Sequence, residues 1–276
     1  MPLSIGKKVA WNTLVQFAGK LVNVSLAIVT LGLLMRYLGT EQFGWYTTVI
    51  SFLQVFGIIA DFGLVIVTTQ MLTEFSNNPR MYGNILGFRI VTAFAIIGLA
   101  PLLVWFFPYP LIIKQGVIIS AAAFISIALQ QVATGVFQRH LAMHINVLGE
   151  FVNRVILLIG ILLVTTGNLG FIPALFVIVL ASIVQLVIYF IGAKKFVPLT
   201  IYFDAREWKI ITHRVAPITL GILFNVIYLR GDILALTLLR PQTEVGLYGA
   251  AYRVLDIITQ VPIMYMGVVL PLITAA

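Results

Sequence analysis

The stretch LLMRYLGTEQFGWYTTVISFLQVFGIIADFGL, residues 33–64, holds a short polar turn, residues 36–42, between two long apolar runs. A weaker copy, LLRPQTEVGLY, returns about two hundred residues later at residues 238–248. Both copies contain an arginine, a Thr-Glu pair and a Gly-x-Tyr in the same order: Arg36, Thr40, Glu41, Gly44 and Tyr46, then Arg240, Thr243, Glu244, Gly246 and Tyr248. This repeat indicates one unit followed by the opening of a second.

Composition places the chain in a membrane. Of its 276 residues, 61% are apolar and only 9% are charged, whereas soluble domains carry roughly 25% charged residues. The sequence therefore predicts an all-α integral membrane protein. The absence of cysteine excludes disulfides. The net charge of +8 does not indicate nucleic-acid binding, because the basic residues sit in short loops rather than on one basic face.

Eight apolar runs approach or exceed the roughly 20 residues that a spanning helix needs. They are continuously apolar and do not alternate, which excludes a barrel. The fifth and sixth are separated only by the polar residues 165–168. The expected spans are 9–35, 43–70, 90–107, 111–137, two within 154–194, 215–239, and 246 to the end.

The basic residues of the loops orient these spans. With a cytoplasmic N-terminus, the outer side holds Arg36, Lys114 and Arg240. The inner side then holds Lys7, Lys8, Arg80, Arg89, Arg139, Arg154, Lys194, Lys195, Arg206, Lys209 and Arg214. Such an excess follows the positive-inside rule. We expect a multi-pass protein of the cell (inner or plasma) membrane with its N-terminus in the cytoplasm.

The repeat and the longest loop divide the chain. We expect a first six-helix bundle at 1–193, a cytoplasmic amphipathic linker at 194–214, and the first two helices of a second bundle at 215–276. Six spans per unit would make the two units parallel repeats, an architecture known among transporters. Because a second unit of equal length needs more sequence, we expect a fragment or a truncated gene product.

Two stretches carry a family likeness. RYLGTEQFGWYTTVISFLQVFGIIADFGL at 36–64 and DILALTLLRPQTEVGLYGAAYRVLD at 232–256 resemble the polysaccharide exporters, or O-antigen flippases, of the multidrug/oligosaccharidyl-lipid/polysaccharide exporter superfamily. The resemblance implies twelve or fourteen spans in two bundles around a central cavity. It implies a substrate of undecaprenyl-pyrophosphate-linked oligosaccharide, turned from the inner to the outer leaflet. Membrane lipids, a polysaccharide polymerase and glycosyltransferases are implied partners.

Four ionisable residues fall inside the seventh and eighth spans: Arg230, Asp232, Arg253 and Asp256. At about 1.5 Å per residue, Arg230 lies about 9 Å and Arg253 about 12 Å below the outer surface, so the four share one layer. Charges in a span are costly and mark functional candidates. One interpretation is that they neutralise one another as structural ion pairs. The other is that Arg230 and Arg253 bind a pyrophosphate, which suits the planar fork of guanidinium.

Other charges are also candidates. Lys20 either extends to the inner headgroups or lines the cavity as a cation. Arg89 and Arg154 each open a span from inside, as an anchor or as a substrate ligand. Glu150 stands four residues before Arg154, a spacing that favours a local salt bridge. Asp61 either binds a coupling cation or pairs with an arginine, Arg80 or Arg89.

Metal and enzyme chemistry find little support. His140 and His144 share a helix face, but no third ligand stands in register, so we expect no metal and no cofactor. Gly83 and Gly87 form a GxxxG pattern at a loop edge, which is a weak indication of helix packing. The sequence contains no phosphate-binding loop, triad or paired carboxylates, so an enzyme is not predicted.

Three functions compete. The first is a flippase of lipid-linked oligosaccharide that works by alternating access. The second is a multidrug antiporter of the same superfamily, which would need acidic residues in its cavity to accept organic cations. The third is a non-transporting membrane scaffold for glycosyltransferases, which would need no charges inside the membrane. The cationic candidates favour the first.

Overall fold

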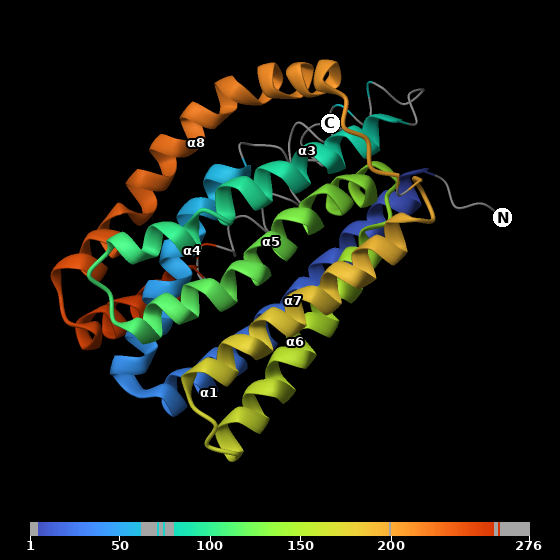
Figure 1. Ribbon diagram of the computed structural model, residues 1–276. Helices are drawn as coiled ribbons and strands as arrows, with labels where there is room; N and C mark the ends of the chain where they lie inside the picture. Colours follow the sequence, from blue (N-terminus) through green and yellow to red (C-terminus); the bar gives the residue numbers. More distant parts are fainter. Residues whose placement is uncertain are drawn as a thin grey trace.

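The computed structural model describes residues 5–61, 71, 74, 80–198, 200–256 and 259, and among these it contains helices and no strand. Its elements are α1 (Ile5–Asp61), α3 (Arg80–Ile97), α4 (Ala100–Leu103), η1 (Val104–Phe106), α5 (Leu111–Arg139), α6 (Met143–Thr166), α7 (Phe171–Ala193) and α8 (Ala205–Leu239). Residues 242–256 form a further helix. In Figure 1, α1, α5, α6 and α7 lie side by side as long rods, and α8 arches away from them. The prediction of an all-α fold is confirmed.

Five of the described helical stretches are long and apolar enough to cross a membrane: 18–61, 81–106, 111–139, 143–166 and 171–193. The first is 44 residues long and bends at Gly39, inside the polar turn expected at 36–42. Gly39 has φ 65°, in the left-handed region that favours glycine. The polar break expected at residues 165–168 also forms a turn: α6 ends at Thr166 and α7 begins at Phe171.

Two expected boundaries differ in the structure. The third span begins at Arg80 rather than near residue 90, because Arg89 is buried inside the bundle instead of marking its surface. Residues 205–214 are not loop but the first turns of α8. The Asp204 side chain accepts a hydrogen bond from the backbone N–H of Arg206 and so caps this helix. Residues 62–70, and those after 256 except residue 259, lie outside the described part of the chain.

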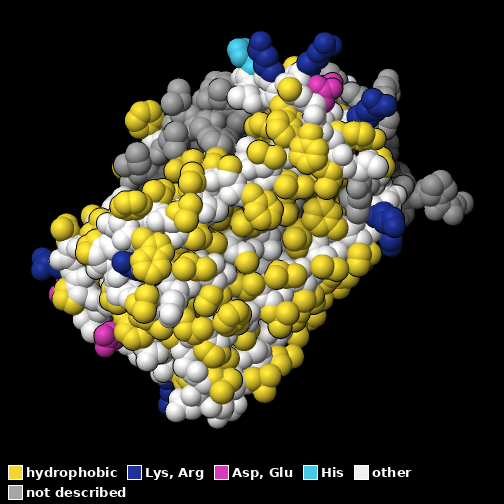
Figure 2. Space-filling view, in the orientation of Figure 1, with side chains coloured by type: hydrophobic (Ala, Val, Ile, Leu, Met, Phe, Trp, Pro, Cys, Tyr) yellow, Lys and Arg dark blue, Asp and Glu magenta, His cyan; other side chains and the backbone are white. Residues whose placement is uncertain are grey.

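The surface has the character expected of a lipid-facing protein. Figure 2 shows one face covered by hydrophobic side chains, with lysines and arginines gathered at its edges. Large apolar residues on four different elements are exposed, including Phe94, Leu102, Leu163 and Ile191. A soluble monomer does not tolerate such a continuous apolar surface, so this protein is a membrane protein.

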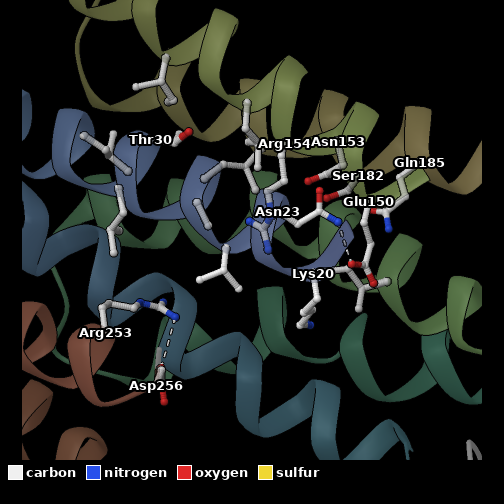
Figure 3. Close-up of a pocket in the computed structure, with 18 of the residues that line it drawn as sticks. Lys20, Asn23, Thr30, Glu150, Asn153, Arg154, Ser182, Gln185, Arg253 and Asp256 are labelled. Atoms are coloured by element: carbon white, nitrogen blue, oxygen red, sulfur yellow. Dashed lines mark hydrogen bonds and ion pairs between the residues drawn. The ribbon is translucent and has the colours of Figure 1, made fainter. Parts of the chain in front are cut away.

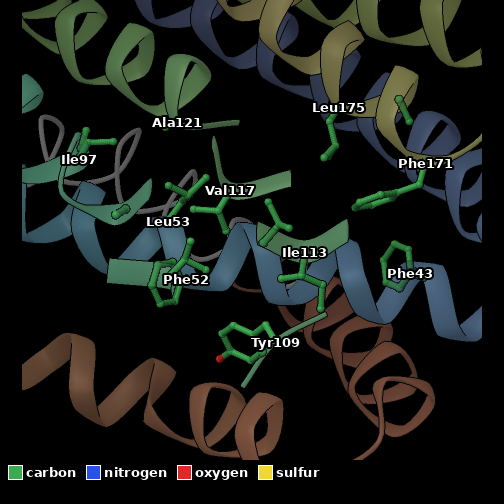
Figure 4. Packing of buried hydrophobic residues seen from close by; sticks show 14 of the residues in the cluster. Phe43, Phe52, Leu53, Ile97, Tyr109, Ile113, Val117, Ala121, Phe171 and Leu175 are labelled. Carbon is green, nitrogen blue, oxygen red and sulfur yellow. The ribbon is translucent and has the colours of Figure 1, made fainter. Parts of the chain in front are cut away.

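The core lies where the second half of α1 meets α5 and α7. Figure 4 shows Phe43 and Phe52 packing toward Ile113, Val117 and Leu175. Phe52 also contacts the rings of Phe107 and Tyr109, with centroids 5.3 Å and 6.3 Å away. The Tyr109 hydroxyl lies 2.8 Å from Oγ1 of Thr237 on α8. The loop between η1 and α5 thus joins this core to α8.

The two copies of the repeat touch each other. A Cβ placed on Gly44 would lie 1.8 Å from the carbonyl oxygen of Gln242, and one placed on Gly246 would lie 2.0 Å from the carbonyl oxygen of Thr40. The Thr48 hydroxyl lies 2.8 Å from Oε1 of Gln242. Gly44 of the first copy packs on the backbone of Gln242, and Gly246 of the second copy packs on the backbone of Thr40. The same backbone contact is thus made from both sides. We call this contact the glycine crossing.

The segment between α7 and α8 is held against α3. The backbone N–H of Tyr202 donates to the carbonyl of Gly83 at 3.2 Å, and the Trp208 indole donates to the carbonyl of Asn84 at 3.2 Å. A Cβ on Gly83 or Gly87 would lie 2.2 Å from a carbonyl oxygen of this segment. The GxxxG pattern therefore accommodates an extended chain rather than a second helix.

Candidate functional site

A cavity of about 470 Å³ lies between the helices α1, α5, α6 and α7 and the helix 242–256. Its walls come from α1, α5, α6 and α7 on one side and from Arg253 and Asp256 on the other. Figure 3 shows these two residues on their own helix, set apart from the polar residues of α1, α6 and α7. Among the described residues that line the cavity, three are cationic (Lys20, Arg154 and Arg253) and two are acidic (Glu150 and Asp256).

Lys20 and Arg154 are two of the three cations among the described residues that line this cavity. Each is partly exposed, and neither has a hydrogen-bond or ion-pair partner among the residues that the structure describes. The salt bridge expected between Glu150 and Arg154 does not form, because the Glu150 carboxylate accepts from two asparagines instead. Both cations are therefore available to an anion inside the cavity.

Arg253 forms the cationic part of the opposite wall. Its Nη1 lies 3.7 Å from Oδ2 of Asp256, three residues along the same helix. Its guanidinium stands 5.9 Å from the ring centre of Tyr46, a residue of the first repeat copy that also lines the cavity. The side chain is 24% exposed, so part of its planar fork faces the cavity.

Arg230 lies behind this wall. Its Nη2 donates to Oδ1 of Asp256 at 3.0 Å, and its guanidinium stands 5.2 Å from the ring centre of Tyr252. Arg230 does not line the described cavity, but it shares the one carboxylate that Arg253 also contacts. Two arginines thus meet a single aspartate here.

Asp232, the fourth charge of this layer, has different partners. Its carboxylate accepts from the Tyr248 hydroxyl at 2.5 Å and from the Tyr252 hydroxyl at 3.3 Å. It also accepts from the backbone N–H of Ile233 at 2.7 Å. Within the described residues it forms no ion pair with Arg230 or Arg253, so the four charges do not pair two by two.

Arg89 and Asp61 lie together, away from the cavity. Nη2 of Arg89 is 2.9 Å from Oδ1 of Asp61. The same guanidinium donates to the backbone carbonyls of Ala60 and Ala128, at 2.5 Å and 2.9 Å, and to the Gln131 side chain. With 1% of its side chain exposed, Arg89 joins α1, α3 and α5 in the interior. Of the two partners expected for Asp61, the structure places Arg89 against it.

Sequence reasoning missed a cluster of uncharged polar residues in the same cavity. Asn23 is 3% exposed, and its Nδ2 donates to Oε2 of Glu150 at 3.2 Å. Nδ2 of Asn146 donates to Oε1 of Glu150 at 2.9 Å. Asn153 and Gln185 line the cavity nearby. The available signal was the spacing of Asn146, Glu150 and Asn153 by four and three residues, which puts them on one face of α6.

No group of three or more histidines or acidic residues that could hold a metal occurs among the described residues. No curated protein and no solved structure matches the chain. A sequence profile of the family described as polysaccharide biosynthesis protein matches residues 5–276. With a membrane-spanning helical fold and nearly its whole length covered by that profile, the chain belongs to the polysaccharide biosynthesis protein family.

Proposed function

We propose that this protein flips an undecaprenyl-pyrophosphate-linked oligosaccharide across the cytoplasmic membrane for polysaccharide biosynthesis. The observation that carries the proposal is the net positive charge of the cavity between the helices α1, α5, α6 and α7 and the helix 242–256. Lys20 and Arg154, which have no partner among the described residues, line it together with a partly exposed Arg253. Lys20 and Arg154 lie on helices that are long and apolar enough to cross a membrane. Cations inside a membrane are costly unless they are paired with an anion. Membership of a polysaccharide biosynthesis family supports our choice of a lipid-linked pyrophosphate as that anion.

In this mechanism the pyrophosphate enters the cavity while the lipid tail stays in the bilayer. Arg253 provides two parallel donors to phosphate oxygens, and Lys20 provides a point charge from α1. Arg230 acts through Asp256, whose carboxylate both arginines share. The contacts of Arg89 favour a structural role in the pair with Asp61 over direct binding of substrate.

Alternating access would follow from movement of the first bundle, 1–193, against a second bundle that begins at 215. Residues 194–214 connect the two and are docked on α3. In the orientation that the loop charges favour, the N-terminus is cytoplasmic. The glycine crossing then lies at the outer ends of the helices.

A multidrug antiporter is less well supported by the cavity. Such a transporter needs a free carboxylate for an organic cation. Here Asp256 is shared by two arginines, and Glu150 lines a cavity that three cations also line. Export of organic cations from whole cells, measured with and without the gene, distinguishes the two functions, and we expect no difference.

The test uses the protein in vesicles that contain an undecaprenyl-pyrophosphate-linked sugar. Arg253→Ala should abolish flipping while the protein still inserts, and Arg253→Lys should restore it only in part, because lysine lacks the planar fork. Arg240→Ala is the matched control, since Arg240 is exposed and outside the cavity. Normal flipping by both Arg230→Ala and Arg253→Ala would leave the ion-pair interpretation in place of the ligand one.

A further inference from the structure

Asn23 has an unsatisfied polar atom at the cavity wall. Its side chain is 3% exposed, and its Nδ2 is used by Glu150. Its Oδ1, however, is buried with no hydrogen-bond partner. Leaving a buried acceptor unpaired costs about 1–3 kcal/mol, and most buried polar groups in folded proteins do have a hydrogen-bond partner. Because Asn23 lines the cavity, a ligand in the cavity is the natural source of the missing donor.

Glu150 lies beside this atom and is held in one orientation. Asn23 donates to one of its carboxylate oxygens and Asn146 to the other. Each oxygen keeps a second acceptor position, since a carboxylate can accept about four hydrogen bonds. Glu150 lines the cavity, so a ligand that carries donors can use these positions.

Asn153 and Gln185 extend the same wall onto α6 and α7 (Figure 3). The Gln185 amide nitrogen donates to the Tyr189 hydroxyl at 3.1 Å, which leaves its amide oxygen as an acceptor. Asn153 is 9% exposed and carries both a donor and an acceptor. With Asn23 and Glu150, these residues bring amide groups and one carboxylate to the same side of the cavity. We call these four residues the polar wall.

Two classes of ligand satisfy acceptors of this kind: a metal cation and a polyhydroxylated group. A sodium ion at the polar wall would sit beside Lys20 and Arg154, which have no partner among the described residues, and like charges repel. A sugar has no such conflict. Each hydroxyl both donates and accepts, and an acetamido group does the same, so a sugar matches a wall of amides and one carboxylate.

We propose that the polar wall formed by Asn23, Glu150, Asn153 and Gln185 binds the hydroxyl and acetamido groups of the substrate's first sugars, opposite the Arg253 wall. This rests on the proposed function, because the sugar arrives attached to the pyrophosphate that the cations bind. The polar wall then determines which oligosaccharide is accepted, and the cations determine that a lipid pyrophosphate is bound.

The experiment compares binding of two kinds of lipid to the purified protein in detergent. The first is undecaprenyl pyrophosphate without sugar. The second is the same lipid carrying N-acetylglucosamine, N-acetylgalactosamine or galactose. Wild type should bind at least one glycosylated lipid about tenfold more tightly than the bare one, the effect of about 1.4 kcal/mol. Asn23→Leu and Asn153→Leu should remove that preference and leave binding of bare undecaprenyl pyrophosphate unchanged.

Thr30→Val is the matched control. Thr30 also lines the cavity, but its hydroxyl donates to the carbonyl of Leu26 in its own helix at 2.8 Å, so its removal should not alter the preference. Arg253→Ala should weaken both kinds of lipid equally.

The outcomes separate the inference from the function on which it rests. If wild type binds neither kind of lipid, the proposed function fails and the polar wall fails with it. If wild type binds lipids but shows no preference for any sugar, or if Asn23→Leu weakens both kinds equally, the polar wall is refuted and the flippase proposal stands. If Asn23→Leu instead abolishes a dependence of binding on sodium, the wall is a cation site.

Discussion

The glycine crossing between the two repeat copies offers the sharpest test of the fold. In Gly44→Ala, the new Cβ would lie 1.8 Å from the carbonyl oxygen of Gln242 and 2.7 Å from its carbonyl carbon. Real Cβ atoms essentially never approach other heavy atoms closer than 3.0 Å. The two backbones must therefore separate by at least about 1.2 Å along this direction, the difference between those values. No rotamer change relieves the clash, because the obstructing atoms are backbone.

The expected cost follows from that displacement. Overpacking of a well-packed contact costs about 1–3 kcal/mol. The separation also weakens the contact between Thr48 and Gln242, now 2.8 Å apart, which adds about 1 kcal/mol for a lost hydrogen bond. Alanine regains up to about 1 kcal/mol through its higher helix propensity. We therefore expect Gly44→Ala to lower the free energy of unfolding by about 1–3 kcal/mol.

The assay is unfolding of the purified protein in mixed micelles by increasing denaturing detergent. Gly32→Ala is the matched control, because Gly32 lies in the same helix and its Cβ would meet nothing within 4 Å. Gly32→Ala should leave the free energy of unfolding unchanged or raise it slightly. Gly246→Ala should resemble Gly44→Ala, and the double variant should cost less than the sum of the two, since both disturb one contact. Equal stability of Gly44→Ala and Gly32→Ala would refute the crossing.

Three further predictions concern other contacts. Arg89→Gln should destabilise the protein by about 3–5 kcal/mol, because it leaves the Asp61 carboxylate without its ion pair to the buried arginine. The yield of folded protein should fall, and Asp61→Asn in the same chain should restore part of that yield. Gly83→Val should detach the segment around Thr200, whose carbonyl oxygen a Cβ would meet at 2.2 Å, and speed limited proteolysis between α7 and α8. Tyr37→Phe should cost about 1 kcal/mol and speed hydrogen exchange of the Gly170 amide, which donates to the Tyr37 hydroxyl at 2.8 Å.

The arrangement of spans was predictable where polar residues and glycines fall together. The turn at 36–42 and the break at 165–168 both appear where hydropathy indicates them, and each has a nearby glycine with positive φ, Gly39 and Gly170. The start of the third span was not predictable in this way. Arg89 reads as a loop charge in the sequence, yet its ion pair with Asp61 allows it to be buried within a helix. A partner 28 residues away cannot be identified from hydropathy.

The candidate site was predictable only in its charges. Charged residues inside apolar runs are easily recognised in the sequence, and Lys20 and Arg253 are two of them. Both line the cavity. Asn23 and Asn153 carry no charge and break no span, so hydropathy gives them little weight. Their importance comes from the proximity of α1 to α6, where Asn23 meets Glu150 at a separation of 127 residues. Contacts of that range depend on helix packing, which continuous apolar faces do not determine.

The charges of the layer also bear on the choice between ion pairing and anion binding. Two arginines and two aspartates would cancel if they paired two by two. Instead the Asp232 carboxylate is bound by Tyr248 and Tyr252, while Arg230 and Arg253 share Asp256. The positive charge is therefore gathered around Asp256, and the compensating negative charge lies on Asp232.

The residues that line the cavity, three cations and two acids, also carry one net positive charge. Outside the lining, Arg230 and Asp232 add one charge of each sign, so the total stays at one. A lipid-linked pyrophosphate diester carries two ionised phosphate groups. In the proposed function, one of these charges would offset the net positive charge of the cavity without displacing the pairs with Asp256. Ion pairing and anion binding are therefore compatible. Under that proposal, the contacts with Asp256 hold the guanidiniums in place, and the bound anion supplies the second negative charge that two arginines require.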